Sequence, residues 1–189
     1  MGRGRLEAFS DGVIAIIITI MVLELKAPHG TDLASLWPLW PVFLSYVLSF
    51  VYLGIYWNNH HHMLHATERV SGGVLWANLH LLFWLSLVPF VTAWMGENHF
   101  AAGPTALYGV VMLLASIAFW ILLQSILAVH GPQSVLRAAV GRDFKGKLYP
   151  LLYLIAIPSA FIREWIAGAL YVIVALIWLV PDRRIERMM

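Results

Sequence analysis

The sequence contains no cysteine, which excludes disulfide bonds, thiolate metal sites and cysteine nucleophiles. Charge is also scarce: Asp, Glu, Lys and Arg make up 12% of the 189 residues, whereas soluble domains carry about 25%. Hydrophobic residues reach 61%, and the mean hydropathy is +0.79. This composition argues against a soluble domain, and we expect a protein of the lipid bilayer.

Long stretches without charged residues divide the chain. They predict an all-α integral membrane protein, with one six-helix transmembrane domain over residues 1–189. The expected spans are about 6–26, 36–60, 70–95, 104–130, 148–163 and 165–181. Proline inside a helix removes a backbone hydrogen bond, so Pro158 predicts a kink in the fifth span, and Pro41 and Pro89 predict similar bends in the second and third.

The placement of the basic residues predicts the orientation in the membrane. An even number of spans puts both termini on one side, and if that side is cytoplasmic, only Lys26 and Arg163 of the 12 Lys and Arg lie on the other. This asymmetry predicts a multi-pass plasma-membrane protein with cytoplasmic termini. We expect the basic segment 137–147 to orient the chain and contact lipid head groups, and we expect no nucleic-acid partner.

The first predicted helix concentrates polar residues at a depth where polar groups are costly and often functional. On a helical wheel of about 100° per residue, one side carries an aliphatic line with a threonine beside it. The residues on this side are Arg5, Phe9, Ile16, Thr19, Ile20 and Leu23. From periodicity alone, the aliphatic line is equally a lipid-facing or packed surface. Asp11 lies about 140° round the wheel, either stabilised by the helix dipole or hydrogen-bonded to a neighbouring His or Trp.

A cluster of four histidines stands at the end of the second span: His60, His61, His62 and His65. His61 and His65 have the i, i+4 spacing of a helical metal pair. The cluster is open to three interpretations, namely interfacial histidines, a structural network with Asp11 or Arg5, and a metal site. The other histidines are isolated, whereas a membrane metalloenzyme needs several such clusters. We therefore expect no metal, no cofactor, no catalytic residues and no enzyme.

Three blocks of sequence resemble the transmembrane protein 175 family of potassium channels. Residues 5–21 resemble its signature of an Arg, three residues and Phe-Ser-Asp at the start of a first membrane helix. Residues 57–61 resemble its Trp-x-x-His-His, and Asn78 with residues 85–90 is similar to a further block. Where the family usually has an Arg after the paired histidines, this chain has His62.

The resemblance implies a prokaryotic single-repeat member that assembles as a homotetramer, with the first helices lining the pore. Carried onto this sequence, it implies a pore constriction at Ile16, Ile20 and Leu23, with Thr19 as the polar pore-lining residue. It also implies a network that ties the pore helix to its neighbours, formed by Arg5, Phe9, Ser10, Asp11, His60 and His61. The carbonyl-filter signature Thr-Val-Gly-Tyr-Gly does not occur in the chain, so we expect no conventional filter.

The expected function is therefore passive, potassium-selective conduction, with potassium ions and the lipid bilayer as partners. A proton-conducting protein or secondary transporter that uses Asp11 and the His60–His65 cluster is the alternative. A membrane-bound metalloenzyme is a third, weaker choice. No predicted helix has the Arg-rich repeat of a voltage sensor, and transporters usually show internal repeats, which this chain lacks.

Overall fold

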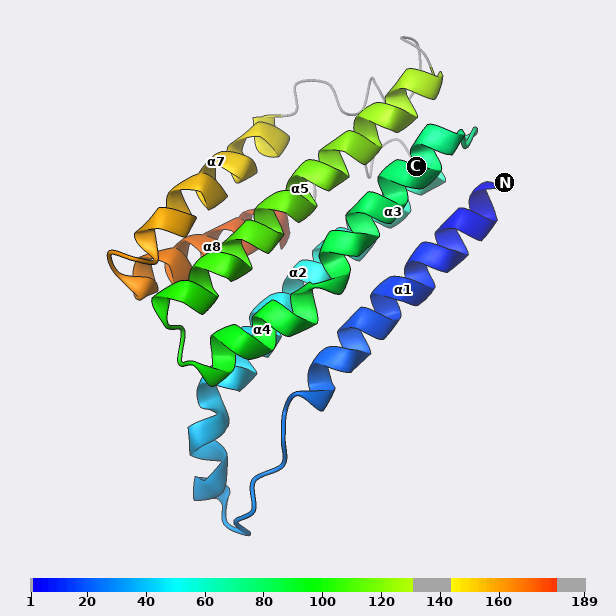
Figure 1. The fold of residues 1–189 in the computed structure, drawn as a ribbon. Coiled ribbons are helices and arrows are strands. Elements are labelled where there is room, and N and C mark those ends of the chain that lie inside the picture. Colours follow the sequence, from blue (N-terminus) through cyan, green and yellow to red (C-terminus); the bar gives the residue numbers. More distant parts are fainter. Residues whose placement is uncertain (1, 131–143, 180–189) are drawn as a thin grey trace.

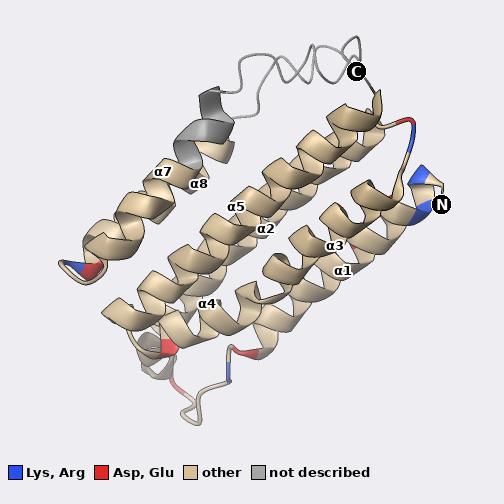
Figure 2. Cartoon of the chain, turned by 45° about the horizontal axis from the view of Figure 1, so that its top comes forward, with Lys and Arg blue, Asp and Glu red and all other residues tan. Residues whose placement is uncertain are grey.

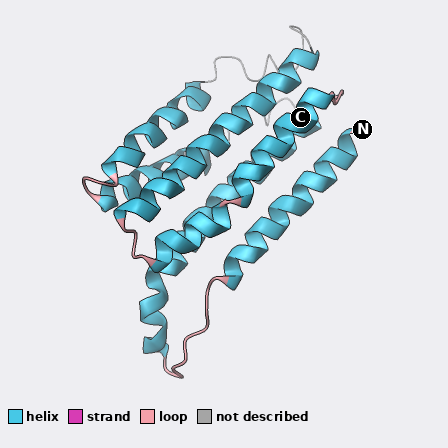
Figure 3. Ribbon diagram, in the orientation of Figure 1, coloured by secondary structure: helices cyan, strands magenta, loops and turns pink. Residues whose placement is uncertain are grey.

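The computed structural model describes residues 2–130 and 144–179. Every regular element in these two stretches is a helix (Figure 3), which confirms the all-α fold predicted from composition. The elements are α1 (Arg3–Leu23), the 3-10 helix η1 (Leu33–Leu39), α2 (Trp40–His65), α3 (Gly72–Ser86), α4 (Val88–Glu97), α5 (Ala102–His130), α7 (Phe144–Ser159) and α8 (Glu164–Leu179).

Successive helices run in opposite directions along the long axis of the molecule, except that α4 continues the direction of α3 (Figure 1). Within residues 2–130 and 144–179, four helical stretches are long and apolar enough to cross a membrane: Arg3–Leu23, Leu33–His65, Gly72–Glu97 and Ala102–His130. The apolar helices Pro150–Ser159 and Glu164–Leu179 are shorter. Each of the predicted spans overlaps one of these apolar helices.

The three prolines expected to bend helices lie at or near helix ends. Pro41 and Pro89 stand in the first turns of α2 and α4, where a missing backbone N–H costs no intrahelical hydrogen bond. The predicted bend in the third span is therefore the break between α3 and α4 at Leu87. The prediction for Pro158 was wrong, because α7 ends at Ser159, and this proline helps to terminate the helix instead of kinking a longer one.

In the part of the chain that the structure describes, most charged residues lie near the two ends of the bundle (Figure 2), whereas Glu7 and Asp11 lie within α1. By the helix bounds, Arg3, Arg5 and Arg69 lie at one end, and Lys26 and Arg163 lie at the other. Most of the predicted basic segment 137–147 lies outside the described residues, as do Arg183, Arg184 and Arg187.

The connection after α1 is anchored by a cap at η1. Asp32 accepts hydrogen bonds from the Ser35 hydroxyl and from the Ser35 backbone N–H, the latter at 3.2 Å. These bonds hold the pKa of the Asp32 carboxyl below its usual range, since both favour the charged form.

The core lies among α2, α3, α4 and α5, and α7 and α8 extend it on one side. Close approach of the helices depends on small residues. The buried Gly96 of α4 is an example, because a β-carbon there would stand 2.8 Å from Cα of Val42 on α2. Helix α1 stands at the edge of this bundle and contacts α2, α3 and α4 (Figure 1).

Candidate functional site

Helix α1 has one face that is packed and one that is open. The buried residues recur every three or four positions and are Leu6, Ser10, Ile14, Ile17 and Met21. This spacing places them on a single stripe against α2, α3 and α4. Within the single chain, the described residues leave the opposite face of α1 uncovered.

The open face carries the aliphatic line predicted from the helical wheel. Ile16 is 58% exposed, Ile20 42% and Leu23 74%. Thr19 stands beside them, and its hydroxyl donates a hydrogen bond to the carbonyl oxygen of Ile16 at 2.9 Å. Because the hydroxyl hydrogen is used within the helix, the oxygen of Thr19 keeps its lone pairs for an outside partner.

A groove of about 620 Å³ lies beside this line, between α1 on one side and the last residue of α3 with α4 on the other. Its walls are mainly apolar, and acidic side chains stand at one end. Residues lining it include Ile16, Ile20, Pro89, Phe90, Trp94, Glu24 and Glu97. The aliphatic line thus borders an open apolar surface of the chain.

A buried chain of polar side chains fixes α1 to its neighbours. Ser10 on α1 donates to the carbonyl oxygen of Leu6 at 2.8 Å and accepts from the side-chain amide of Asn78 on α3 at 2.9 Å. The amide oxygen of Asn78 then accepts from Nε2 of His60 on α2, at 2.7 Å. Ser10, Asn78 and His60 are fully buried, so this chain joins three helices away from solvent.

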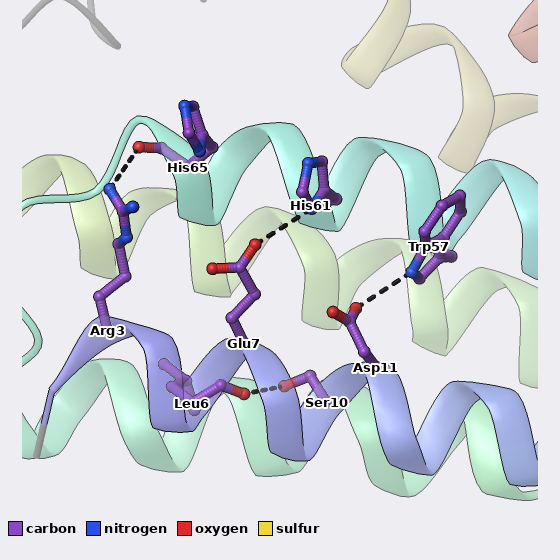
Figure 4. Close-up of polar contacts among 8 residues, drawn as sticks. All are labelled: Arg3, Leu6, Glu7, Ser10, Asp11, Trp57, His61 and His65. Atoms are coloured by element: carbon purple, nitrogen blue, oxygen red, sulfur yellow. Dashed lines mark hydrogen bonds and ion pairs between the residues drawn. The ribbon is translucent and has the colours of Figure 1, made fainter.

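A second row of contacts follows the antiparallel edges of α1 and α2 (Figure 4). One residue per turn of α1 meets one residue per turn of α2. The contacts join Nη1 of Arg3 to the carbonyl oxygen of His65 at 2.9 Å, Oε1 of Glu7 to Nδ1 of His61 at 3.1 Å, and Oδ1 of Asp11 to Nε1 of Trp57 at 3.0 Å. Both the depth and the rotation of α1 are fixed by these contacts.

The structure brings together four of the residues assigned to the network by resemblance, namely Ser10, Asp11, His60 and His61. Arg5 and Phe9 lie apart from it: both are exposed, and no described residue bonds their side chains. The helical wheel placed both on the side of Ile16, so their position away from the buried face of α1 was predictable from the sequence.

Sequence reasoning left a neighbouring His or Trp open as the partner of Asp11, and the structure identifies this partner as Trp57. Glu7 and Asn78 were not assigned to the network. The i, i+4 spacing of Glu7 with Asp11 and of Trp57 with His61 was the available signal. Their pairing depends on the register between α1 and α2, which spacing within one helix does not give.

These features define a helical membrane protein whose first helix is pinned on one face and presents an aliphatic line on the other. Residues 5–89 match the family model described as endosomal/lysosomal potassium channel TMEM175. A protein of Chryseobacterium sp. (strain P1-3) named a potassium channel is 53% identical over 187 residues, which cover 99% of this chain and 97% of that protein. The chain therefore belongs to the TMEM175 family.

A solved structure has the same fold. The crystal structure titled as a lysosomal potassium-selective channel TMEM175 homologue from Chamaesiphon minutus matches with a TM-score of 0.79 and 32% identity, over 94% of this chain and 96% of that one. A Gallus gallus relative named endosomal/lysosomal proton channel TMEM175 is 37% identical over 73 residues, which cover 32% of this chain and 15% of that protein. The family is one of ion channels and not an enzyme class.

Proposed function

We propose that the protein is a potassium-selective channel of a prokaryotic plasma membrane, formed by four copies of the chain with α1 around a central pore. The observation that carries the proposal is the exposed aliphatic line of Ile16, Ile20 and Leu23 on α1. The likeness to a structure titled as a potassium-selective channel supports it.

Exposure alone does not distinguish a pore face from a lipid face, since lipid also accepts aliphatic side chains. The fixed rotation of α1 supplies the distinction. Hydrogen bonds at Ser10 and Asp11 hold the opposite side of the helix against α2 and α3, so the line points in one constant direction. A symmetric assembly converts such a line into rings of identical residues.

Stacked rings of Ile16, Ile20 and Leu23 provide selectivity without carbonyl coordination. A narrow apolar ring passes an ion only after part of its water shell is lost, and potassium releases water more readily than sodium. Thr19 stands within the same stretch, and its free lone pairs offset part of the lost hydration. No cofactor is required besides the permeant ion.

The finer topology belongs to the same proposal. Six spans per subunit would put both termini in the cytoplasm and Lys26 and Arg163 on the outer side. Helix α8 has 16 described residues and a length of about 24 Å, which local thinning of the bilayer accommodates. Arg5 and Phe9 have no side-chain hydrogen-bond or ion-pair partner among the described residues, and we assign their network role to contacts with a neighbouring copy.

The test compares potassium and sodium flux through the protein reconstituted in liposomes. Replacing Ile16 with Asn or Ala widens or wets the narrowest ring, so sodium permeability should rise relative to potassium. Ile173→Ala on α8 is the matched control, since Ile173 is 46% exposed on another helix. Unchanged selectivity in both Ile16 variants, or an equal change in the control, contradicts the assignment.

Proton conduction is the second candidate, because vertebrate relatives such as the Gallus gallus protein are named proton channels. The same liposomes loaded with a pH-sensitive dye measure proton leak directly. A proton flux that persists while potassium flux is absent favours this alternative, using Asp11 and the His60–His65 cluster, over the potassium channel.

A further inference from the structure

Two carboxylates of α1 face α2 without a Lys or Arg partner among the described residues. Glu7 and Asp11 stand one turn apart on α1, and their described partners are an imidazole and an indole. Among the described residues, no Lys or Arg lies within salt-bridge distance of either carboxylate, because Arg3 bonds the carbonyl oxygen of His65 instead. This arrangement leaves negative charge that favours a bound cation.

The ligand atoms are already close together. One atom each from Glu7, Asp11 and His61 lies within 4.8 Å of the others, and all three residues are partly buried. Two ligands of one tetrahedral zinc ion lie roughly 3.3–3.6 Å apart, and the distance from Oε1 of Glu7 to Nδ1 of His61 is 3.1 Å. Small side-chain rotations would therefore bring the three ligand atoms within bonding distance of one ion.

The surroundings hold these side chains in place, as the second shell of a metal site does. Nε1 of Trp57 donates to one oxygen of Asp11 and leaves the other free (Figure 4). The ring of His61 stacks between the rings of Trp57 and His65, at centroid distances of 6.1 Å on both sides. This stacking keeps Nδ1 of His61 directed at α1.

We propose that Glu7, Asp11 and His61 form a site for a divalent first-row transition ion, such as Zn²⁺, that joins α1 to α2. The imidazole nitrogen favours such ions over Mg²⁺ and Ca²⁺, which take oxygen ligands. The side chain of His61 is 42% exposed, so water reaches the fourth position. The expectation of no metal rested on the isolation of the other histidines, and the metal pair considered was His61 with His65, whereas the structure brings His61 together with Glu7 and Asp11. The site does not depend on the proposed conduction, because binding is measured without flux.

The first test is calorimetric titration of Zn²⁺ into purified, chelator-treated protein. Wild type should bind one ion per chain, and Glu7→Gln and His61→Ala should each weaken binding by at least about tenfold. His65→Ala is the matched control, because His65 lies one turn further along α2, contacts the ring of His61 and is outside the ligand set. Size-exclusion profiles establish that each variant is folded. Absence of binding by wild type, or an equal loss in the control, overturns the site.

A second variant uses the absence of cysteine from the chain. His61→Cys places a lone thiol in the ligand set, so Co²⁺ should produce a near-ultraviolet thiolate charge-transfer band. His65→Cys places the same thiol one turn away and should produce none. No band in His61→Cys, or equal bands in the two variants, contradicts the site even where the alanine variant fails to fold.

Discussion

At the scale of single residues, the side chain of Asn78 links three helices. Its amide gives one hydrogen bond to Ser10 and receives one from His60, and all three residues are fully buried. Since Asn78 donates to Ser10, its oxygen is left to accept, which places the proton of His60 on Nε2. One amide therefore orients residues on both neighbouring helices.

Replacing Asn78 with Leu should lower the thermal stability of the assembled protein and leave its potassium-to-sodium selectivity unchanged. Interhelical hydrogen bonds in membranes contribute about 0.6 kcal/mol on average, and each buried group left unpaired costs about 1–3 kcal/mol. Heating followed by size-exclusion chromatography measures the loss. Asn59→Leu is the control, because among the described residues the amide of Asn59 bonds only the carbonyl oxygen of Ile55 in its own helix. An equal loss in the control argues against the role given to Asn78.

How far the sequence predicts the site differs between its two parts. The exposed line was predictable, because residues 16, 20 and 23 share a face at the helical period. A His or Trp partner for Asp11 was one predicted alternative, but the choice of Trp57 and the contact of Glu7 with His61 were not predictable, because each depends on how far α1 is shifted along α2. Buried pairs such as Ser10 with Asn78 likewise join residues distant in sequence.

At the scale of elements, the spacing between helices is set by where small residues stand. Gly96 lies where α4 meets α2, and a β-carbon there would also contact the hydroxyl of Ser45 and the carbonyl oxygen of Pro41. In lipid, helices associate through close packing and hydrogen bonds rather than hydrophobic burial. A glycine at this contact therefore determines how closely α2 and α4 pack.

Gly96→Ala should reduce the thermal stability of the protein, because the two helices must separate to admit the methyl group. Overpacking of this kind costs about 1–3 kcal/mol, and the higher helix propensity of alanine returns at most about 1 kcal/mol. Gly168→Ala in α8 is the matched control, since no atom lies within 4 Å of its β-carbon position, and it should be neutral or stabilising. A melting temperature of Gly96→Ala at or above wild type would show that the contact is loose.

The positions of the helices could be predicted from the long stretches without charged residues, because a charged side chain is costly at membrane depth. Their ends were less predictable. Pro89 correctly indicated a break in the third span, but Pro158 stands next to the last residue of α7, where it ends the helix. Proline has the same local effect in both places, and the packing beyond it decides whether the helix resumes.

At the scale of the whole molecule, α1 is incomplete in a single chain. Its aliphatic line is open, the groove of about 620 Å³ borders it, and Arg5 and Phe9 are exposed on the same helix. The opposite face is fixed by hydrogen bonds to α2 and α3. A surface that is rigidly positioned yet unoccupied is expected where copies of one chain meet around an axis.

Cysteine cross-linking tests this arrangement directly, because the natural chain contributes no thiol. Leu23 is 74% exposed at the end of α1, so copies of Leu23→Cys that meet around the pore should form covalent dimers on mild oxidation. Trp165→Cys is the control, since Trp165 is 71% exposed at the start of α8, at the same end of the bundle but on another face. Denaturing electrophoresis shows the dimers, and light scattering of the unoxidised protein should give the mass of four chains. If Trp165→Cys cross-links and Leu23→Cys does not, the copies meet through α8, and α1 faces lipid instead of a pore.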